Sequence, residues 1–93
     1  MITGEIYGKI AIIGVPIYYK FMSVDGNVVS AVYFGRDSCG EWCCDEKIDK
    51  YPVEYFNRAY AVRVAKNEDE FKNLTQKEQS DLYDEMYKYK MWS

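Results

Sequence analysis

The chain has 93 residues, which is enough for one compact domain and too few for two. Hydrophobic residues make up 48% and charged residues 29%, a balance that excludes a disordered tail, a collagen-like repeat and a low-complexity linker. The formal charge of −3 argues against a protein that wraps duplex DNA, and the absence of histidine excludes histidine-based nucleophiles, general bases and histidine-rich metal sites. We therefore expect a single domain, residues 1–93, that is not an enzyme and has no direct contact with nucleic acid.

The N-terminal region predicts a cytoplasmic protein with no membrane contact. Its strongly apolar run, residues 10–17, is interrupted by Gly14 and Pro16, so it resembles neither a signal peptide nor a membrane span. The three cysteines are an odd set crowded into residues 39–44, which is a poor framework for disulfide bonds in a secreted fold.

Strand patterns dominate the first third of the chain. Residues 4–13 are expected to form a strand that ends in a bend at residues 14–16. The segment Val-Asp-Gly-Asn-Val at residues 24–28 predicts a hairpin with a two-residue type I′ turn at Asp25-Gly26. With that turn, one face of the hairpin would carry a set of core side chains: Ile17, Tyr19, Phe21, Val28, Val32 and Phe34.

The middle of the chain is less regular. Residues 35–50 are polar and have no sustained period, so we expect a long cysteine-containing loop there. Pro52 suits the first turn of a short helix, and the alternation from Tyr60 to Val64 predicts a further strand.

Two capping boxes mark helix starts near the C-terminus, Asn67-x-x-Glu70 and Thr75-x-x-Glu78. The second should open a helix over residues 76–90, with Leu82, Met86 and Tyr89 on its apolar face. The expected architecture is α+β: a three- to four-stranded antiparallel sheet with a C-terminal helix packed on it and a long cysteine-containing loop.

One cluster contains metal-ligand types, namely Cys39, Cys43, Cys44 and Asp45. Thiolates with a carboxylate can hold zinc, which would be the only cofactor. The spacing is not that of the common zinc motifs, so reduced thiols, partly buried as small apolar groups, are the favoured interpretation. A redox role is a third alternative.

Negative charge is concentrated in one segment. Between Asn67 and Met86 seven carboxylates accompany two lysines, so the segment carries −5. Acids in a first helical turn favour the helix dipole, but those in the middle of a helix gain little from it. The segment is therefore either a solvated helix face or a surface complementary to the basic groove of a partner protein, with exposed tyrosines adding contact area. The candidate partner-binding residues are Glu68, Asp69, Glu70, Asp81, Asp84, Glu85, Tyr83 and Tyr87.

A short acidic chain with ten tyrosines and no catalytic motif is similar in overall character to the small anti-CRISPR proteins of phages and mobile elements, particularly inhibitors of type II effector nucleases. The resemblance implies a non-enzymatic inhibitor in the bacterial host cytoplasm that binds a CRISPR effector nuclease and blocks DNA binding or loading. The alternatives are a small zinc-binding or redox module centred on Cys39, Cys43 and Cys44, and a host-side regulatory subunit. Both a monomer and a homodimer are compatible with the sequence.

Overall fold

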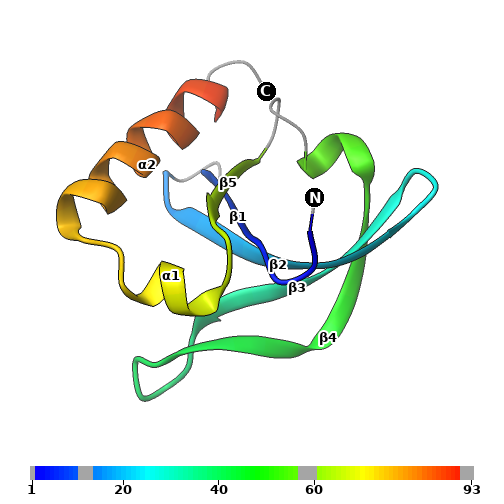
Figure 1. Cartoon of the computed structure of the whole chain (residues 1–93), viewed down its shortest axis with the longest axis horizontal. Helices are drawn as coiled ribbons and strands as arrows, with labels where there is room; N and C mark the ends of the chain where they lie inside the picture. The colour runs from blue at the N-terminus through cyan, green and yellow to red at the C-terminus, as the bar shows by residue number, and fades with distance from the viewer. Residues whose placement is uncertain (1, 11–13, 57–60, 91–93) are drawn as a thin grey trace.

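The computed structural model describes residues 2–10, 14–56 and 61–90 (Figure 1). Within them, five strands form one antiparallel sheet in the order β4-β3-β2-β1-β5. The strands are β1 (Ile6–Ile10), β2 (Pro16–Asp25), β3 (Val28–Arg36), β4 (Trp42–Pro52) and β5 (Val62–Ala65). A 3-10 turn, η1 (Val53–Phe56), follows β4, and the helices α1 (Glu68–Lys72) and α2 (Gln76–Lys90) follow β5. The α+β class, with the C-terminal helix packed on an antiparallel sheet, is confirmed, as is a helical turn followed by a strand, but Pro52 is the last residue of β4 and not part of the helical turn. Residues 11–13 of the first predicted strand, and Tyr60, lie outside the described residues.

The predicted strand count and the long cysteine-containing loop were wrong. Residues 35–50 contain the end of β3, a short turn and most of β4. The turn is closed by the carboxylate of Asp37, whose Oδ1 accepts the N–H groups of Cys39 (2.9 Å) and Glu41 (3.0 Å). β4 is an edge strand and most of its residues are exposed. Because neither of its faces is fully buried, its sequence lacks the apolar alternation by which a strand is recognised.

The β2–β3 hairpin forms where it was predicted, but its turn and register differ. Asp25 pairs with Val28, so the two-residue loop is Gly26-Asn27. Gly26 has φ 60°, and among the described residues only glycines have positive φ, which fits a type II′ turn instead of type I′. The shifted register and a bulge near Phe21 pair Phe34 with Tyr18. Phe34 therefore lies on the opposite face from Phe21, contrary to the predicted core face.

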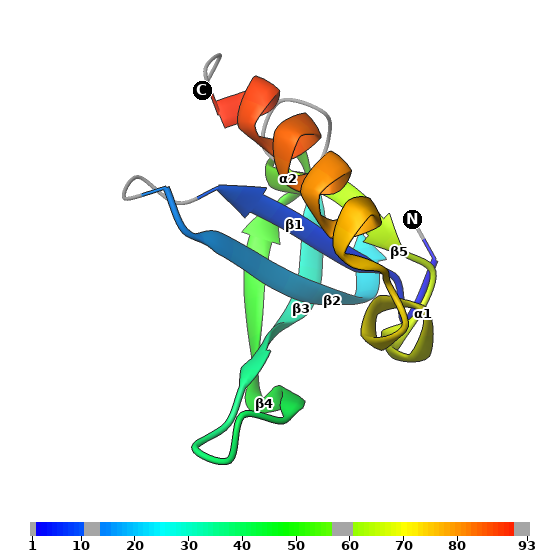
Figure 2. The ribbon, with the colours of Figure 1, turned by 90° about the vertical axis from the view of Figure 1, so that its left-hand side faces the viewer.

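The sheet buries apolar side chains on both faces. One cluster lies under the helices and combines Ile6, Ile10 and Phe34 of the sheet with Phe71 of α1 and Met86 of α2. The other lies on the opposite face and contains Tyr7, Tyr19, Phe21, Val29, Ala31 and Ala61. Figures 1 and 2 show α1 and α2 together on one side of β1 and β5, and Figure 2 shows the strong twist that turns β3 and β4 away from β1. Because both faces are covered, the aromatic excess of the chain is used largely in packing.

A glycine in β1 sets how closely α2 approaches the sheet. Gly8 pairs with Tyr18 on one side and Val62 on the other. A Cβ atom at Gly8 would lie 2.6 Å from the Sδ of Met86 and 2.9 Å from the Tyr18 ring. The helix thus rests on the bare backbone of the strand at this point.

Both helices start at the predicted caps. Asn67 accepts the N–H of Glu70 (2.8 Å) at the start of α1. At α2 the capping box is complete: Thr75 Oγ1 accepts the N–H of Glu78 (3.1 Å), and Glu78 Oε1 accepts the N–H of Thr75 (3.0 Å). Met86 is buried and Leu82 packs against the same cluster, as predicted for the apolar face of this helix. The side chain of Tyr89 lies outside the described part.

Candidate functional site

Glu68, the first candidate acid, is engaged within the fold. Its carboxylate accepts a hydrogen bond from Lys20 Nζ at 2.8 Å, and the thiol of Cys44 lies 3.6 Å from the other oxygen. The ammonium of Lys20 holds the pKa of Glu68 below its ordinary value, and the carboxylate raises the pKa of Lys20. This contact ties α1 to β2 and β4, so Glu68 is a structural residue and not a free acidic group.

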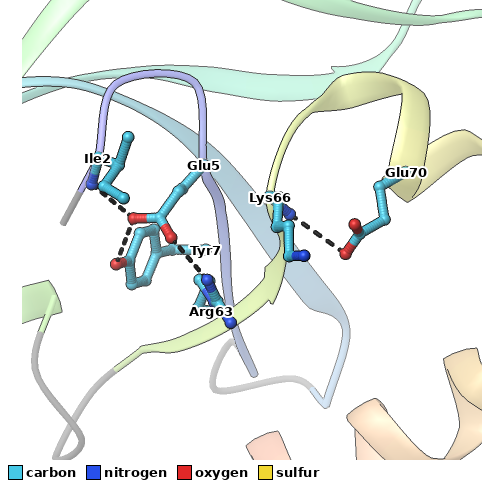
Figure 3. Close-up of polar contacts among 6 residues, drawn as sticks. All are labelled: Ile2, Glu5, Tyr7, Arg63, Lys66 and Glu70. Carbon is cyan, nitrogen blue, oxygen red and sulfur yellow. Dashed lines mark hydrogen bonds and ion pairs between the residues drawn. The ribbon is translucent and has the colours of Figure 1, made fainter.

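The remaining acids of α1 are exposed. Asp69 carries its carboxylate in solvent, while Glu70 Oε1 accepts the backbone N–H of Lys66 at 3.3 Å, as Figure 3 shows. The reciprocal bond of this capping box therefore reaches one residue further back than predicted.

The outward side of α2 carries both signs of charge. Asp81 forms an ion pair with Lys77 at 3.3 Å, in which both side chains are largely exposed, so the pair contributes little to stability. Lys88 lies four residues after Asp84 on the same side of the helix. Asp84 and Glu85 are exposed and make no ion pair with any described residue. The concentrated charge expected from the sequence is thus reduced to a smaller set of free carboxylates.

Of the two candidate tyrosines of α2, Tyr87 lies one helical turn from Asp84, whereas Glu85, two residues before Tyr87, points to another side of the helix. The rings of Tyr83 and Tyr87 stack with centroids 6.2 Å apart and an interplanar angle of 24°. The hydroxyl of Tyr83 donates to the carbonyl of Gly14 at 2.9 Å, which fixes this ring, while Tyr87 stays 43% exposed. A partly exposed tyrosine that stacks on a fixed ring, one turn from a free carboxylate, is suited to a protein contact.

The candidate zinc ligands are not brought together. Cys43 and Cys44 are neighbours on β4, so their side chains point to opposite faces: Cys44 packs against the core cluster and Cys43 is exposed. Cys39 is exposed in the turn before β4, and Asp45 shares the side of Cys43. Over the described ranges, no group of three or more histidine, cysteine or acidic side chains is close enough to hold a metal ion. Burial, with the nearby carboxylate of Glu68, raises the pKa of the Cys44 thiol and so disfavours the metal-binding thiolate.

A buried acid at the N-terminal end of β1 was not anticipated from the sequence. Glu5 is only 4% exposed, and its carboxylate meets Arg63 Nη1 at 2.9 Å, the N–H of Ile2 at 2.6 Å and the hydroxyl of Tyr7 at 3.2 Å (Figure 3). Burial alone would raise the pKa of Glu5, but these donors together lower it. Burial and the neighbouring carboxylate raise the pKa of Tyr7 to about 12. With both oxygens engaged, Glu5 joins the N-terminal segment to β5 and is not poised as a general base.

An open cavity of about 290 Å³ lies where the helices meet the sheet. Three of its walls are the rings of Tyr18, Trp42 and Phe71, with Trp42 and Phe71 centroids 4.8 Å apart and Tyr18 and Phe71 also 4.8 Å apart. Its remaining apolar lining comes from Pro16, Val64, Leu74 and Leu82. We call this the aromatic cavity.

Two cations lie at the aromatic cavity. The guanidinium carbon of Arg36 is 4.9 Å from the centroid of the Trp42 ring, and Lys72 lines the α1 side. Neither forms an ion pair with a residue in the described ranges. Sequence reasoning missed this site because its walls come from β2, β3, β4, β5, α1, α2 and the α1–α2 connection; the aromatic excess was the only available signal.

Comparison of the chain with known proteins finds no matching family model, no matching curated protein and no matching solved structure. Of the helices in the described part of the chain, none combines the length and apolar character needed to cross a bilayer.

Proposed function

We propose that this protein is a non-enzymatic inhibitor, acting in the bacterial cytoplasm, that binds a nucleic-acid-handling protein through the outer side of α2. The observation that carries the proposal is the free carboxylate of Asp84, one helical turn from the partly exposed ring of Tyr87, with Glu85 as a second free carboxylate on the exposed surface of α2. The proposed partner is a type II CRISPR effector nuclease, in line with the overall character of the chain.

The chemistry of such a contact follows from its components. A groove that holds nucleic acid is lined by lysine and arginine, so free carboxylates on a rigid helix complement it and accelerate encounter. Tyr87, held against Tyr83, adds apolar contact area at a small cost in side-chain entropy. A protein seated in the groove excludes the phosphate backbone, and this would block DNA binding or loading.

The surface is narrower than the eight residues expected from the sequence. Glu68 is committed to Lys20, Asp81 to Lys77, and the hydroxyl of Tyr83 to the carbonyl of Gly14. The contact is therefore assigned to Asp84, Glu85 and Tyr87, with Tyr83 as the residue that positions Tyr87. Asp69 and Glu70 lie on the separate helix α1, where Glu70 accepts the N–H of Lys66, and they are not assigned to this contact.

The test is a binding measurement between the full chain and a purified type II effector with its guide RNA, by biolayer interferometry. Asp84→Lys with Glu85→Lys is expected to weaken binding by more than about tenfold, because like charges then face each other. A matched control, Asp45→Lys with Glu46→Lys, makes the same change in net charge at two exposed adjacent positions on β4 and is expected to leave affinity within about twofold. Absence of binding by the unaltered chain, or equal loss in both double variants, would overturn the proposal.

A further inference from the structure

The aromatic cavity is separate from the proposed α2 contact and carries the opposite charge. Its walls are three aromatic rings and four aliphatic or proline side chains, while Arg36 and Lys72 are the charged groups that line it. In a chain with net charge −3, two cations without an ion-pair partner among the described residues at one apolar opening are a distinct local feature. A ligand that complements Arg36 and Lys72 carries negative charge.

The size of the aromatic cavity limits the apolar part of that ligand. Pockets for drug-sized molecules span about 300–1,000 Å³, and an apolar cavity of about 150 Å³ holds one benzene. At about 290 Å³ this cavity is suited to one large aromatic side chain with part of its backbone. The perpendicular arrangement of Trp42 and Phe71, at 80°, offers both an edge and a face to an entering ring.

The rings are also held in place before any ligand arrives. Trp42 stacks on the fully buried Phe34 at 5.5 Å and lies under Arg36, while Phe71 is itself buried. A preformed apolar pocket loses little side-chain freedom on binding, which favours a short anchor segment. Arg36 is already held over a ring of the wall, so its guanidinium is positioned to pair with a carboxylate beside the entering side chain.

We propose that the aromatic cavity is a docking site for a partner peptide in which a single aromatic side chain is flanked by acidic residues. The aromatic ring packs against the wall that Tyr18, Trp42 and Phe71 form together, and the flanking carboxylates pair with Arg36 and Lys72. This site recognises acidic segments, whereas the α2 surface recognises basic ones, so the protein has two contacts of opposite charge preference.

The test uses the ¹⁵N-labelled full chain and three acetylated, amidated peptides, Gly-Asp-Phe-Asp-Gly, Gly-Lys-Phe-Lys-Gly and Gly-Asp-Ala-Asp-Gly, followed by NMR titration. The first peptide is expected to give saturable shifts at the Trp42 indole N–H and at the amides of Phe71 and Leu82. The other two peptides are expected to bind about tenfold more weakly or not at all, because the lysine peptide lacks the negative charges and the alanine peptide lacks the aromatic ring.

Two charge variants establish where the preference arises. Arg36→Glu with Lys72→Glu is expected to reverse the order of the acidic and basic phenylalanine peptides. Lys50→Glu with Lys88→Glu makes the same change in net charge at exposed positions away from the cavity, and it should leave the order unchanged. All of these are surface changes, and the amide spectrum of each variant shows directly whether it has folded.

The proposal would be overturned by absence of saturable shifts with the acidic phenylalanine peptide, by equal binding of the lysine peptide, or by shifts that map away from the aromatic cavity. Free phenylacetate that binds the same residues more tightly than the peptide would also overturn it, in favour of a small-molecule site. None of these outcomes depends on the α2 surface, so the two proposals can fail independently.

Discussion

Gly8→Ala is expected to destabilise the protein, because a methyl group at this position meets both the helix above β1 and the strand beside it. The added Cβ would lie 2.6 Å from Met86 Sδ and 2.9 Å from the Tyr18 ring. Met86 is 2% exposed, and the Tyr18 ring is in contact with both Trp42 and Phe71. Met86 can therefore move only by repacking the buried cluster under the helices, whereas Tyr18 lines the aromatic cavity and has room on that side.

Two opposing effects set the size of the change. Replacing glycine by alanine inside a strand gains about 0.5–1 kcal/mol from the smaller entropy of the unfolded chain. Overpacking a well-filled core costs about 1–3 kcal/mol. The overpacking should prevail by about 1 kcal/mol, which corresponds to a decrease in Tm of about 4–8 °C for a domain of this size. Thermal and urea denaturation followed by circular dichroism measure both quantities.

Two comparisons isolate the contact with Met86. In a Met86→Ala background the sulfur is gone, so Gly8→Ala should cost less than in the native chain. Gly35→Ala would place a Cβ 2.5 Å from the Tyr33 ring, but Tyr33 is 46% exposed and can swing into solvent, so a smaller loss is expected. A higher Tm for Gly8→Ala, or an equal cost with and without Met86, would refute the reasoning.

Three further changes test other parts of the fold. Thr75→Ala removes the cap of α2 and should lower the free energy of unfolding by about 1 kcal/mol, whereas Ser80→Ala inside the same helix should change it by less than about 0.5 kcal/mol in the same urea titration. Lys20 lowers the pKa of Glu68 from its ordinary 4.5, so this carboxylate stabilises the fold above that pH and the contribution is lost as the pH falls through the lower folded-state pKa. In Glu68→Gln the free energy of unfolding should therefore fall less steeply as the pH is lowered below about 4.5. An unchanged dependence on pH would contradict the ion pair. Burial raises the pKa of Cys44, so iodoacetamide should modify it more slowly than it modifies the exposed Cys43 at about pH 8, as peptide mass spectrometry can measure; equal rates would disagree with its packing.

The elements that the sequence predicts well are those whose signals are local. Thr75 and Glu78 form a capping box through their own backbone groups, and this placed the start of α2 correctly. β4 could not be recognised, because an edge strand with two largely solvated faces lacks apolar alternation. The hairpin was located but not its register, since either Asp25-Gly26 or Gly26-Asn27 places a glycine in the loop, and the bulge near Phe21 depends on tertiary packing.

The candidate site was less predictable than the fold. Charge counting identifies carboxylates but not their partners, and Lys20, which engages Glu68, lies 48 residues away in the sequence. Cys43 and Cys44 are adjacent in sequence, and the strand separates them onto opposite faces. The aromatic cavity depends on the same long-range assembly, because Tyr18 of β2 meets Phe71 of α1 only in the folded chain.

The position of β1 between β2 and β5 has a consequence for how the chain emerges from the ribosome. β1 is made before both of its neighbours, β2 and β5, and before the Met86 side chain that covers Gly8. The β2–β3 hairpin can close while translation continues, but Ile6 and Ile10 have no cover from α2 until the final turns of that helix leave the exit tunnel. During this interval the apolar side chains of β1 are exposed to solvent. We expect a ribosome-associated chaperone to bind the chain at this strand.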